Sequence, residues 1–193
     1  MMKQSRVLNE QQVRKLLNST KMTRHSDRNR LVLILSYYVG MRSCEICSLK
    51  ISDVLDSDGN VKESVILKSY QTKGKKCNTV YFSEFVRNEI SKYLSTYKKL
   101  TENTSRYLIE SQKGGKFSSS TLQHLFKHLY ENVGFDDCSS HSGRRTFITQ
   151  LSERGISVRV IQELSRHENM TTTQRYIDVS VDKLKKSVET VSY

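Results

Sequence analysis

Proline is absent from the sequence, so that residue breaks no helix or strand. Helix ends therefore have to be inferred from glycines and from capping side chains. No apolar run reaches the about 18 residues that a membrane span needs, and the stretch 31–39 has about half that length. Residues 1–12 lack the apolar core of a signal peptide. These absences predict a cytoplasmic protein that does not span a membrane.

Patterns that hold metal ions are scarce as well. Cys44 and Cys47 form a CxxC pair, but the other two cysteines stand alone, so a four-ligand zinc site lacks its second pair. His124 and His128 have i, i+4 spacing without an HExxH motif or a nearby acid. We therefore expect no metal site. The thiols should be buried, in a reducing compartment, and the two histidines should lie in solvent.

The strongest compositional signal is positive charge. The chain has 32 Lys and Arg residues against 20 acids, a net charge of +12. Such a surplus indicates a polyanionic partner, most simply nucleic acid, although charge alone also serves solubility. The chain has 193 residues and neither repeats nor flexible linkers. We expect a single domain over 1–193, with a flexible N-terminus at 1–7 and an amphipathic tail helix at 180–193.

Helical signals cover most of the sequence. The run 31–39 is apolar nearly all round, so its helix should lie at the centre of the core and end at Gly40. A helix from 83 to about 99 and another from 118 to 134 each present one apolar face. Five residues are expected to cap helices: Asn9, which forms a capping box with Gln12, and Asp27, Ser43, Ser83 and Ser118.

Strand signals are confined to the middle of the chain. The segments 64–69 and 78–82 flank a Lys-rich connection and predict a β-hairpin. A short strand is possible at 107–110, and 53–60 has the composition of a turn. Together these patterns predict an α+β fold that is mainly α-helical, with a small antiparallel sheet.

Candidate catalytic residues gather in the stretch 140–176. His141 and Arg144 are three residues apart, and His167 and Tyr176 follow. Arg binds phosphate through a bidentate fork, His moves protons near neutral pH, and Tyr can act as a nucleophile. Gly and Ser residues at 155–157 separate two short helices. We expect His141 and Arg144 one turn apart on the first helix and His167 at the end of the second.

These residue types suit the cleavage of a phosphodiester. A tyrosine with a pKa of about 10 is scarcely ionised at pH 7, and nearby cations lower that pKa. Two arginines would stabilise the negative charge of the transition state, and a Lys or His would protonate the leaving oxygen. Metal-dependent cleavage needs clustered carboxylates instead, and the nearest approach to a cluster is Asp136 with Asp137. A covalent, metal-free mechanism is therefore favoured.

The motifs resemble a known family. His141-x-x-Arg144, His167 and Tyr176 are similar to the carboxyl-terminal signature of the tyrosine recombinases, the phage integrases and their relatives. The segment GMRSCEICSL at 40–49 looks like the family's first-arginine motif, and TKGKK looks like its catalytic-lysine turn. The resemblance spans about residues 8–180. It implies a catalytic domain of this family, and it adds Arg42, its supporting acid Glu45, and Lys73 to the candidate site.

The resemblance also implies a role for each residue. Arg42, Arg144 and His167 would bind the scissile phosphate, and Tyr176 would attack it to give a 3′-phosphotyrosyl link and a free 5′-hydroxyl. Lys73 would protonate the leaving oxygen, with help in proton transfer from His141. The bond energy is kept, so neither ATP nor a metal or other cofactor is needed. Backbone phosphates would be contacted by Lys68, Lys75, Lys76 and Arg145, the last of which otherwise faces solvent.

The resemblance implies double-stranded DNA as the partner of a site-specific recombinase that is a monomer when free and a tetramer on DNA. Its tail helix would dock on a second copy. Three features depart from the pattern. Gly143 and Arg145 stand where the family often has Leu and His, and the segment between Arg42 and Lys73 is a few residues longer than the family pattern. The family's amino-terminal helical domain is not seen. We expect either a piece of a recombinase or a natural minimal form.

Two alternatives remain open on sequence alone. A type IB topoisomerase-like enzyme would nick and reseal DNA with the same chemistry and without exchanging strands. A DNA-binding regulator would bind without cutting, although no catalytic residue type is missing for cleavage.

Overall fold

The computed structural model describes residues 5–72, 74, 76–176, 185 and 188–189. The chain divides into two compact units, Met1–Phe147 and Ile148–Tyr193. The boundary falls inside helix α8, Ser142–Glu153. Whether the two units form the single domain expected from the sequence stays a prediction. Among the described residues, no helix is both long and apolar enough to cross a membrane.

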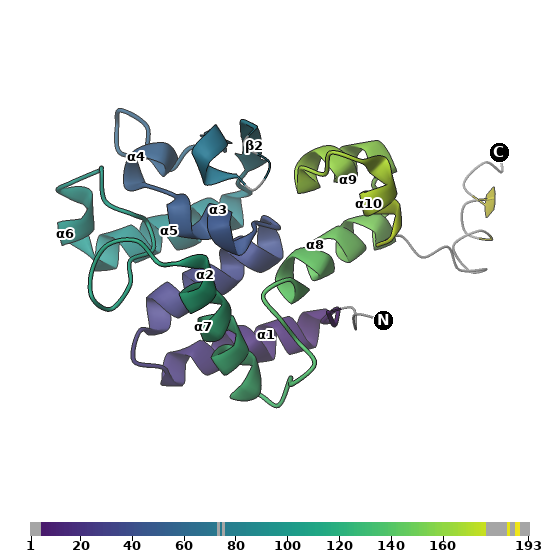
Figure 1. Cartoon of the computed structure of the whole chain (residues 1–193), viewed down its shortest axis with the longest axis horizontal. Coiled ribbons are helices and arrows are strands. Elements are labelled where there is room, and N and C mark those ends of the chain that lie inside the picture. Colours follow the sequence, from purple (N-terminus) through teal and green to yellow (C-terminus); the bar gives the residue numbers. More distant parts are fainter. Residues whose placement is uncertain (1–4, 73, 75, 177–184, 186–187, 190–193) are drawn as a thin grey trace. The chain divides into compact units, whose positions relative to one another are not determined.

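The first unit consists of helices and one small β-hairpin, which lies at its edge (Figure 1). Helix α2 packs against α5 and α3, and α7 packs against α1 and α3. The helices are α1 Glu10–Ser19, α2 Ser26–Tyr38, α3 Ser43–Ser48, α4 Ile51–Val54, α5 Glu84–Thr96, α6 Lys98–Thr101 and α7 Ser119–Glu131, with short 3-10 turns η1 Thr20–Met22 and η2 Ser69–Gln71. The predicted mainly helical α+β class is confirmed.

Helix α2 forms the centre of the core, as its composition predicted. Every side chain from Leu31 to Leu35 is at most 2% exposed. A helix that is apolar on all sides can only be stable when it is surrounded, which explains why other helices cover it. The helix ends at Tyr38, and Gly40 follows with a φ of 65°. This left-handed backbone favours glycine and turns the chain sharply toward α3.

The predicted caps are partly confirmed. Asn9 and Gln12 form the capping box of α1, and Ser83 and Ser118 cap α5 and α7. Two caps were wrong. Asp27 lies inside the first turn of α2, where a negative charge favours the helix N-terminus, and His25 holds the cap position. Ser43 is the first residue of α3 rather than its cap, because the Glu45 carboxylate accepts the Arg42 N–H.

The β-hairpin is confirmed. Strands β1 Ser64–Leu67 and β2 Asn78–Tyr81 are antiparallel, with Val65 opposite Val80 and both side chains buried. The predicted strand at 107–110 is wrong, because Tyr107 and Glu110 make only isolated bridges, to Lys50 and Lys116. The predicted turn at 53–60 is also partly wrong, since its first two residues end the short helix α4.

The second unit contains the last turns of α8, helix α9 Val158–Ser165 and helix α10 Met170–Gln174. Helices α9 and α10 pack against each other. The hydroxyl of Ser157 accepts the Val160 N–H and so caps α9, as expected from the punctuation at 155–157. The tail helix predicted at 180–193 falls mostly outside the described residues, of which 185 and 188–189 are helical.

An ion pair between α2 and α5 gives the first prediction. Arg30 donates two hydrogen bonds to Glu89, at 2.9 and 2.7 Å, and these hold the pKa of that carboxyl below its usual value. The stabilisation is therefore present above the unfolded-state pKa of about 4.3 and is lost as the pH falls through the lower folded-state pKa. Glu89→Gln should lower the free energy of unfolding by about 1 kcal/mol at pH 7.

Urea unfolding at stepwise lower pH would measure this difference, which should shrink toward zero in acid. Glu131→Gln is a matched control, because its ion pair with Lys127 is largely exposed and should contribute little. A deficit in Glu89→Gln that is constant at every pH would contradict the role of the ion pair.

Candidate active site

The corner between α2 and α3 brings two of the predicted arginines together. Nη1 of Arg144 donates a hydrogen bond of 2.6 Å to the Gly40 carbonyl oxygen, and Arg144 is only 5% exposed. Arg42 follows Gly40 by two residues and precedes the first turn of α3. The start of α8 therefore places its arginine directly at the corner from which the other arginine projects.

Arg42 is held by a buried acid. Glu45 is fully buried, and its two carboxylate oxygens accept the Arg42 backbone N–H and the Arg42 Nη1, both at 2.8 Å. The Arg42 side chain is 26% exposed, so its remaining N–H groups are not all enclosed. Because one carboxylate fixes both the main chain and the guanidinium of Arg42, the side chain is held in position before any ligand arrives.

Close packing of α8 on α2 explains the first departure from the family pattern. A Cβ atom on Gly143 would lie 2.2 Å from Ser36 Oγ and 2.9 Å from Ser36 Cβ, so no larger side chain fits there. Gly40 is constrained likewise, since an added Cβ would lie 2.5 Å from the Phe147 ring. Two glycines therefore allow the backbone approach that seats Arg144 on the Gly40 carbonyl.

His141 and Arg145 flank this contact. His141 is exposed and lies just before α8 rather than on it, which corrects the prediction. Its carbonyl oxygen accepts the Arg145 N–H at 2.9 Å, so the residue serves as the start of the helical ladder. Arg145 is half-buried. That its side chain contacts a phosphate, and the alternative that it faces solvent, both stay predictions.

The predicted lysines lie on and beside the hairpin connection. Lys68 and Lys76 are exposed, whereas Lys73 and Lys75 fall outside the described residues. The residues on either side of that connection are tied together, because the Thr72 hydroxyl donates to the Lys76 carbonyl oxygen at 2.8 Å.

Gln71 anchors the start of the connection, a role that was not predicted from the sequence. It is 1% exposed, and its amide nitrogen donates to the Ser48 carbonyl and to Asp53 Oδ2, both at 2.9 Å. Its amide oxygen accepts the Lys68 N–H at 2.7 Å. The η2 turn that carries Gln71 is thus locked onto α3 and α4. A lone Gln in a polar run carries no signal for such a role.

In the second unit, His167 and Tyr176 lie together. Their rings are stacked, with centroids 5.8 Å apart and planes at 19°. Nδ1 of His167 lies 2.9 Å from the hydroxyl of Thr173, which is fully buried in α10. This hydrogen bond orients the imidazole, and the short helix α10 was not predicted.

His167 does not end α9 as predicted but follows it by two residues. The intervening Arg166 has a φ of 55°, a left-handed conformation that is rare for a residue other than glycine. Gln162 closes this turn, since its carbonyl accepts the His167 N–H at 3.1 Å and its amide nitrogen donates to the His167 carbonyl at 3.1 Å. Because no glycine marks the turn, it could not be predicted from the local sequence.

The cysteines and histidines outside these clusters do not gather. Cys47 is buried, and burial raises the pKa of its thiol to about 12. Cys44 and Cys138 are half-buried and Cys77 is exposed, so the expectation of buried thiols holds only for Cys47. His124 and His128 are exposed, as predicted. Over the part of the chain that the structure describes, no three His, Cys, Asp or Glu residues lie close enough to hold a metal ion.

The side chains of the two units are of the types that take part in phosphoryl transfer. The first unit supplies two arginines and a histidine at the start of α8, and the second supplies a tyrosine with an oriented imidazole. Guanidinium groups suit a phosphate, and a phenol beside an imidazole suits nucleophilic attack with proton transfer. That the two sets act on one phosphate stays a prediction.

The packing of α8 on α2 gives the second prediction. Gly143→Ala should lower the free energy of unfolding by about 1–3 kcal/mol, because the new methyl group overlaps Ser36. In a Ser36→Gly background the same change should cost much less, because both overlapping atoms are gone. Urea unfolding of the four proteins in this cycle measures the coupling. Additive effects would show that the contact does not limit the approach of the helices.

The chain is similar in sequence to known tyrosine recombinases. The tyrosine recombinase XerA of Pyrococcus horikoshii is 34% identical over 164 residues, covering 84% of this chain and 54% of that protein. XerC of Staphylococcus epidermidis is 30% identical over 160 residues, covering 82% and 52%. This chain thus spans about half the length of these relatives.

Solved structures agree on the fold. A crystal structure of XerA recombinase matches 97% of this chain and 66% of its own, with a TM-score of 0.77 at 25% identity. A Tn1549 transposon integrase in complex with transposon right end DNA matches 97% of this chain and 66% of its own, with a TM-score of 0.77 at 17% identity. The model of the phage integrase family matches residues 6–183. The chain therefore belongs to the phage integrase family, whose relatives here are tyrosine recombinases.

Proposed function

We propose that this chain is the catalytic part of a site-specific DNA recombinase, which cuts and rejoins strands through a covalent 3′-phosphotyrosyl intermediate. The observation that carries the proposal is the pair of arginines fixed at the Gly40 corner, one by a main-chain carbonyl and one by a buried carboxylate. Family membership and the stacked His167–Tyr176 pair support the same chemistry.

In this mechanism the arginines bind before they catalyse. Arg42 and Arg144 donate to the non-bridging oxygens of the scissile phosphate, where negative charge grows in the transition state. Since both are already held in place, little reorganisation is needed as the charge develops. His167, whose Nδ1 is engaged by Thr173, contributes its other ring nitrogen to the same phosphate.

The covalent steps balance without an added cofactor. The Tyr176 oxygen forms a bond to phosphorus as the bond to the 5′ oxygen breaks, with His141 assisting removal of the phenolic proton and Lys73 protonating the leaving oxygen. A 5′-hydroxyl from a second strand then attacks the phosphotyrosine, and Tyr176 leaves. The bond energy is conserved through both transfers.

The partner proposed for this chemistry is double-stranded DNA. A net charge of +12 favours a polyanion, and a XerH structure in the same fold is a pre-cleavage complex with its difH substrate. We further propose that the free chain is a monomer, that tetramers form on DNA, and that Lys68, Lys75, Lys76 and Arg145 contact backbone phosphates. Cytoplasmic location fits a DNA partner.

The nucleophile gives the third prediction. Wild-type protein mixed with duplexes that carry a nick and a randomised centre should trap a protein–DNA adduct that survives denaturing electrophoresis, because the nick lets the freed segment diffuse away. Tyr176→Phe should abolish the adduct and keep DNA binding. Tyr81→Phe, which alters an exposed hairpin tyrosine, should behave as wild type. An undiminished adduct from Tyr176→Phe would reject this nucleophile, and bound DNA without any adduct would reject cleavage.

The leaving-group acid gives the fourth prediction. Once an adduct-forming sequence is selected, Lys73→Ala should slow cleavage by about 10²-fold or more, as loss of a general acid does. A substrate with sulfur at the bridging 5′ position should restore most of the rate, because a thiolate leaves without a proton. Lys76→Ala is the matched control, and rescue of that variant in place of Lys73→Ala would move the acid to Lys76.

A further inference from the structure

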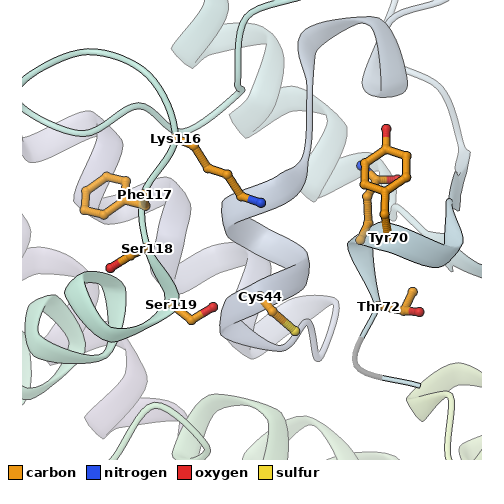
Figure 2. A pocket seen from close by; sticks show the side chains of 8 residues that line it. Cys44, Tyr70, Thr72, Lys116, Phe117, Ser118 and Ser119 are labelled. Carbon is orange, nitrogen blue, oxygen red and sulfur yellow. The ribbon is translucent and has the colours of Figure 1, made fainter. Parts of the chain in front are cut away.

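A second feature of the first unit adjoins the proposed catalytic residues. A cleft of about 470 Å³ is lined by Cys44, Tyr70, Thr72, Lys116, Ser118 and Ser119, among others. Figure 2 shows Lys116, Ser118 and Ser119 on one side of α3, Tyr70 and Thr72 on the other, and Cys44 projecting from α3 between them. Cys44 follows Arg42 by two residues, and Thr72 immediately precedes Lys73. The cleft therefore lies next to two segments that carry the proposed chemistry.

We propose that this cleft binds one nucleotide of the DNA strand next to the scissile phosphate, with its phosphate at Lys116 and its sugar or base against Tyr70. The inference rests on the proposed function and adds a contact site that the catalytic residues do not supply.

The polar groups of the cleft suit an anion. Among the described residues that line it none is acidic, and Lys116 brings a positive charge on an exposed side chain. Burial, followed by the nearby Glu45 charge, raises the pKa of the Cys44 thiol, so this group is neutral at pH 7. The hydroxyls of Thr72 and Ser119 can both donate to a phosphate oxygen. A cleft whose polar groups are neutral or cationic favours an anion such as phosphate over a cation.

The walls of the cleft are fixed in the absence of a ligand. On one side, buried Gln71 ties η2 to Ser48 and Asp53, and so sets the backbone between Tyr70 and Thr72. On the other side, Cys47 Sγ donates to the Ser118 carbonyl at 3.7 Å and links α3 to the segment before α7. A preformed site loses less conformational entropy on binding than one that must be assembled.

Tyr70 supplies the nucleoside contact. Tyr70 is 63% exposed, which is high for a large aromatic residue. An exposed aromatic ring in a groove that carries positive charge is the arrangement on which nucleic-acid bases stack. The volume of the cleft lies within the about 300–1,000 Å³ that small ligands occupy, so a single nucleotide fits.

Cysteine alkylation tests the site with a matched pair inside one molecule. Cys44 and Cys138 are both half-buried, and burial raises the pKa of both thiols, so the rate of each is compared with its own rate without DNA. Only Cys44 lines the cleft. The full chain is treated with iodoacetamide at about pH 8.5, with and without a saturating random-sequence 20-base-pair duplex, and each cysteine is followed by mass spectrometry. DNA should slow alkylation of Cys44 at least about fivefold and leave Cys138 unchanged.

Variants assign the effect to the proposed contacts. Lys116→Ala should weaken DNA binding and reduce the slope of log affinity against log salt by about 1, as loss of one phosphate contact does. Tyr70→Ala should weaken binding about tenfold with an unchanged slope, and Tyr70→Phe should bind as wild type because the ring remains. Lys21→Ala, an exposed lysine outside the cleft, is the control for general charge.

The possible outcomes separate this inference from the proposed function. If DNA binds in a mobility-shift assay while Cys44 reacts at its free rate, the cleft is not a nucleotide site and the recombinase proposal stands. Equal protection of Cys44 and Cys138 would indicate a general loss of access and would also overturn the cleft. A chain that binds no DNA at all would overturn both.

Discussion

The approach of α8 to the end of α2 is the constraint on which the catalytic half of the first unit depends. Arg144 reaches the Gly40 carbonyl only because Gly143 lies against Ser36 and Phe147 lies against Gly40. A buried guanidinium needs hydrogen-bond acceptors, and the main-chain oxygen at this corner provides one that no substitution removes. The same corner begins α3 and so determines where Arg42 leaves the backbone.

The positive groups of the chain are held by different kinds of partner. Arg144 donates to a carbonyl and Arg42 to a fully buried carboxylate, whereas Arg30, near the start of α2, donates to the half-buried carboxylate of Glu89 in α5. A carbonyl orients a cation without cancelling its charge, whereas a carboxylate does both. Of the two proposed phosphate ligands, Arg42 therefore has a fully buried anionic partner that fixes its guanidinium in position.

Local chemistry made much of the fold predictable. Capping side chains located α1, α5 and α7, and the unbroken apolar run identified α2 as central. The types and order of the candidate catalytic residues were visible in the same way. The contacts that position them were not, because Gly143 meets Ser36, and Gln71 meets Ser48, only after the chain has folded. Arg166 shows the other limit, since a left-handed turn without glycine leaves no mark in the sequence.

The hydrogen bonds that Gln162 makes to the His167 backbone have a consequence for how this turn responds to pH. An amide side chain has no ionisation near neutrality, so its grip on the main chain is the same in acid and in alkali. A carboxylate at this position would change its hydrogen bonds to the backbone whenever it gained or lost a proton. Because Gln162 is neutral, the hydrogen bonds that hold the His167 backbone do not themselves change with pH.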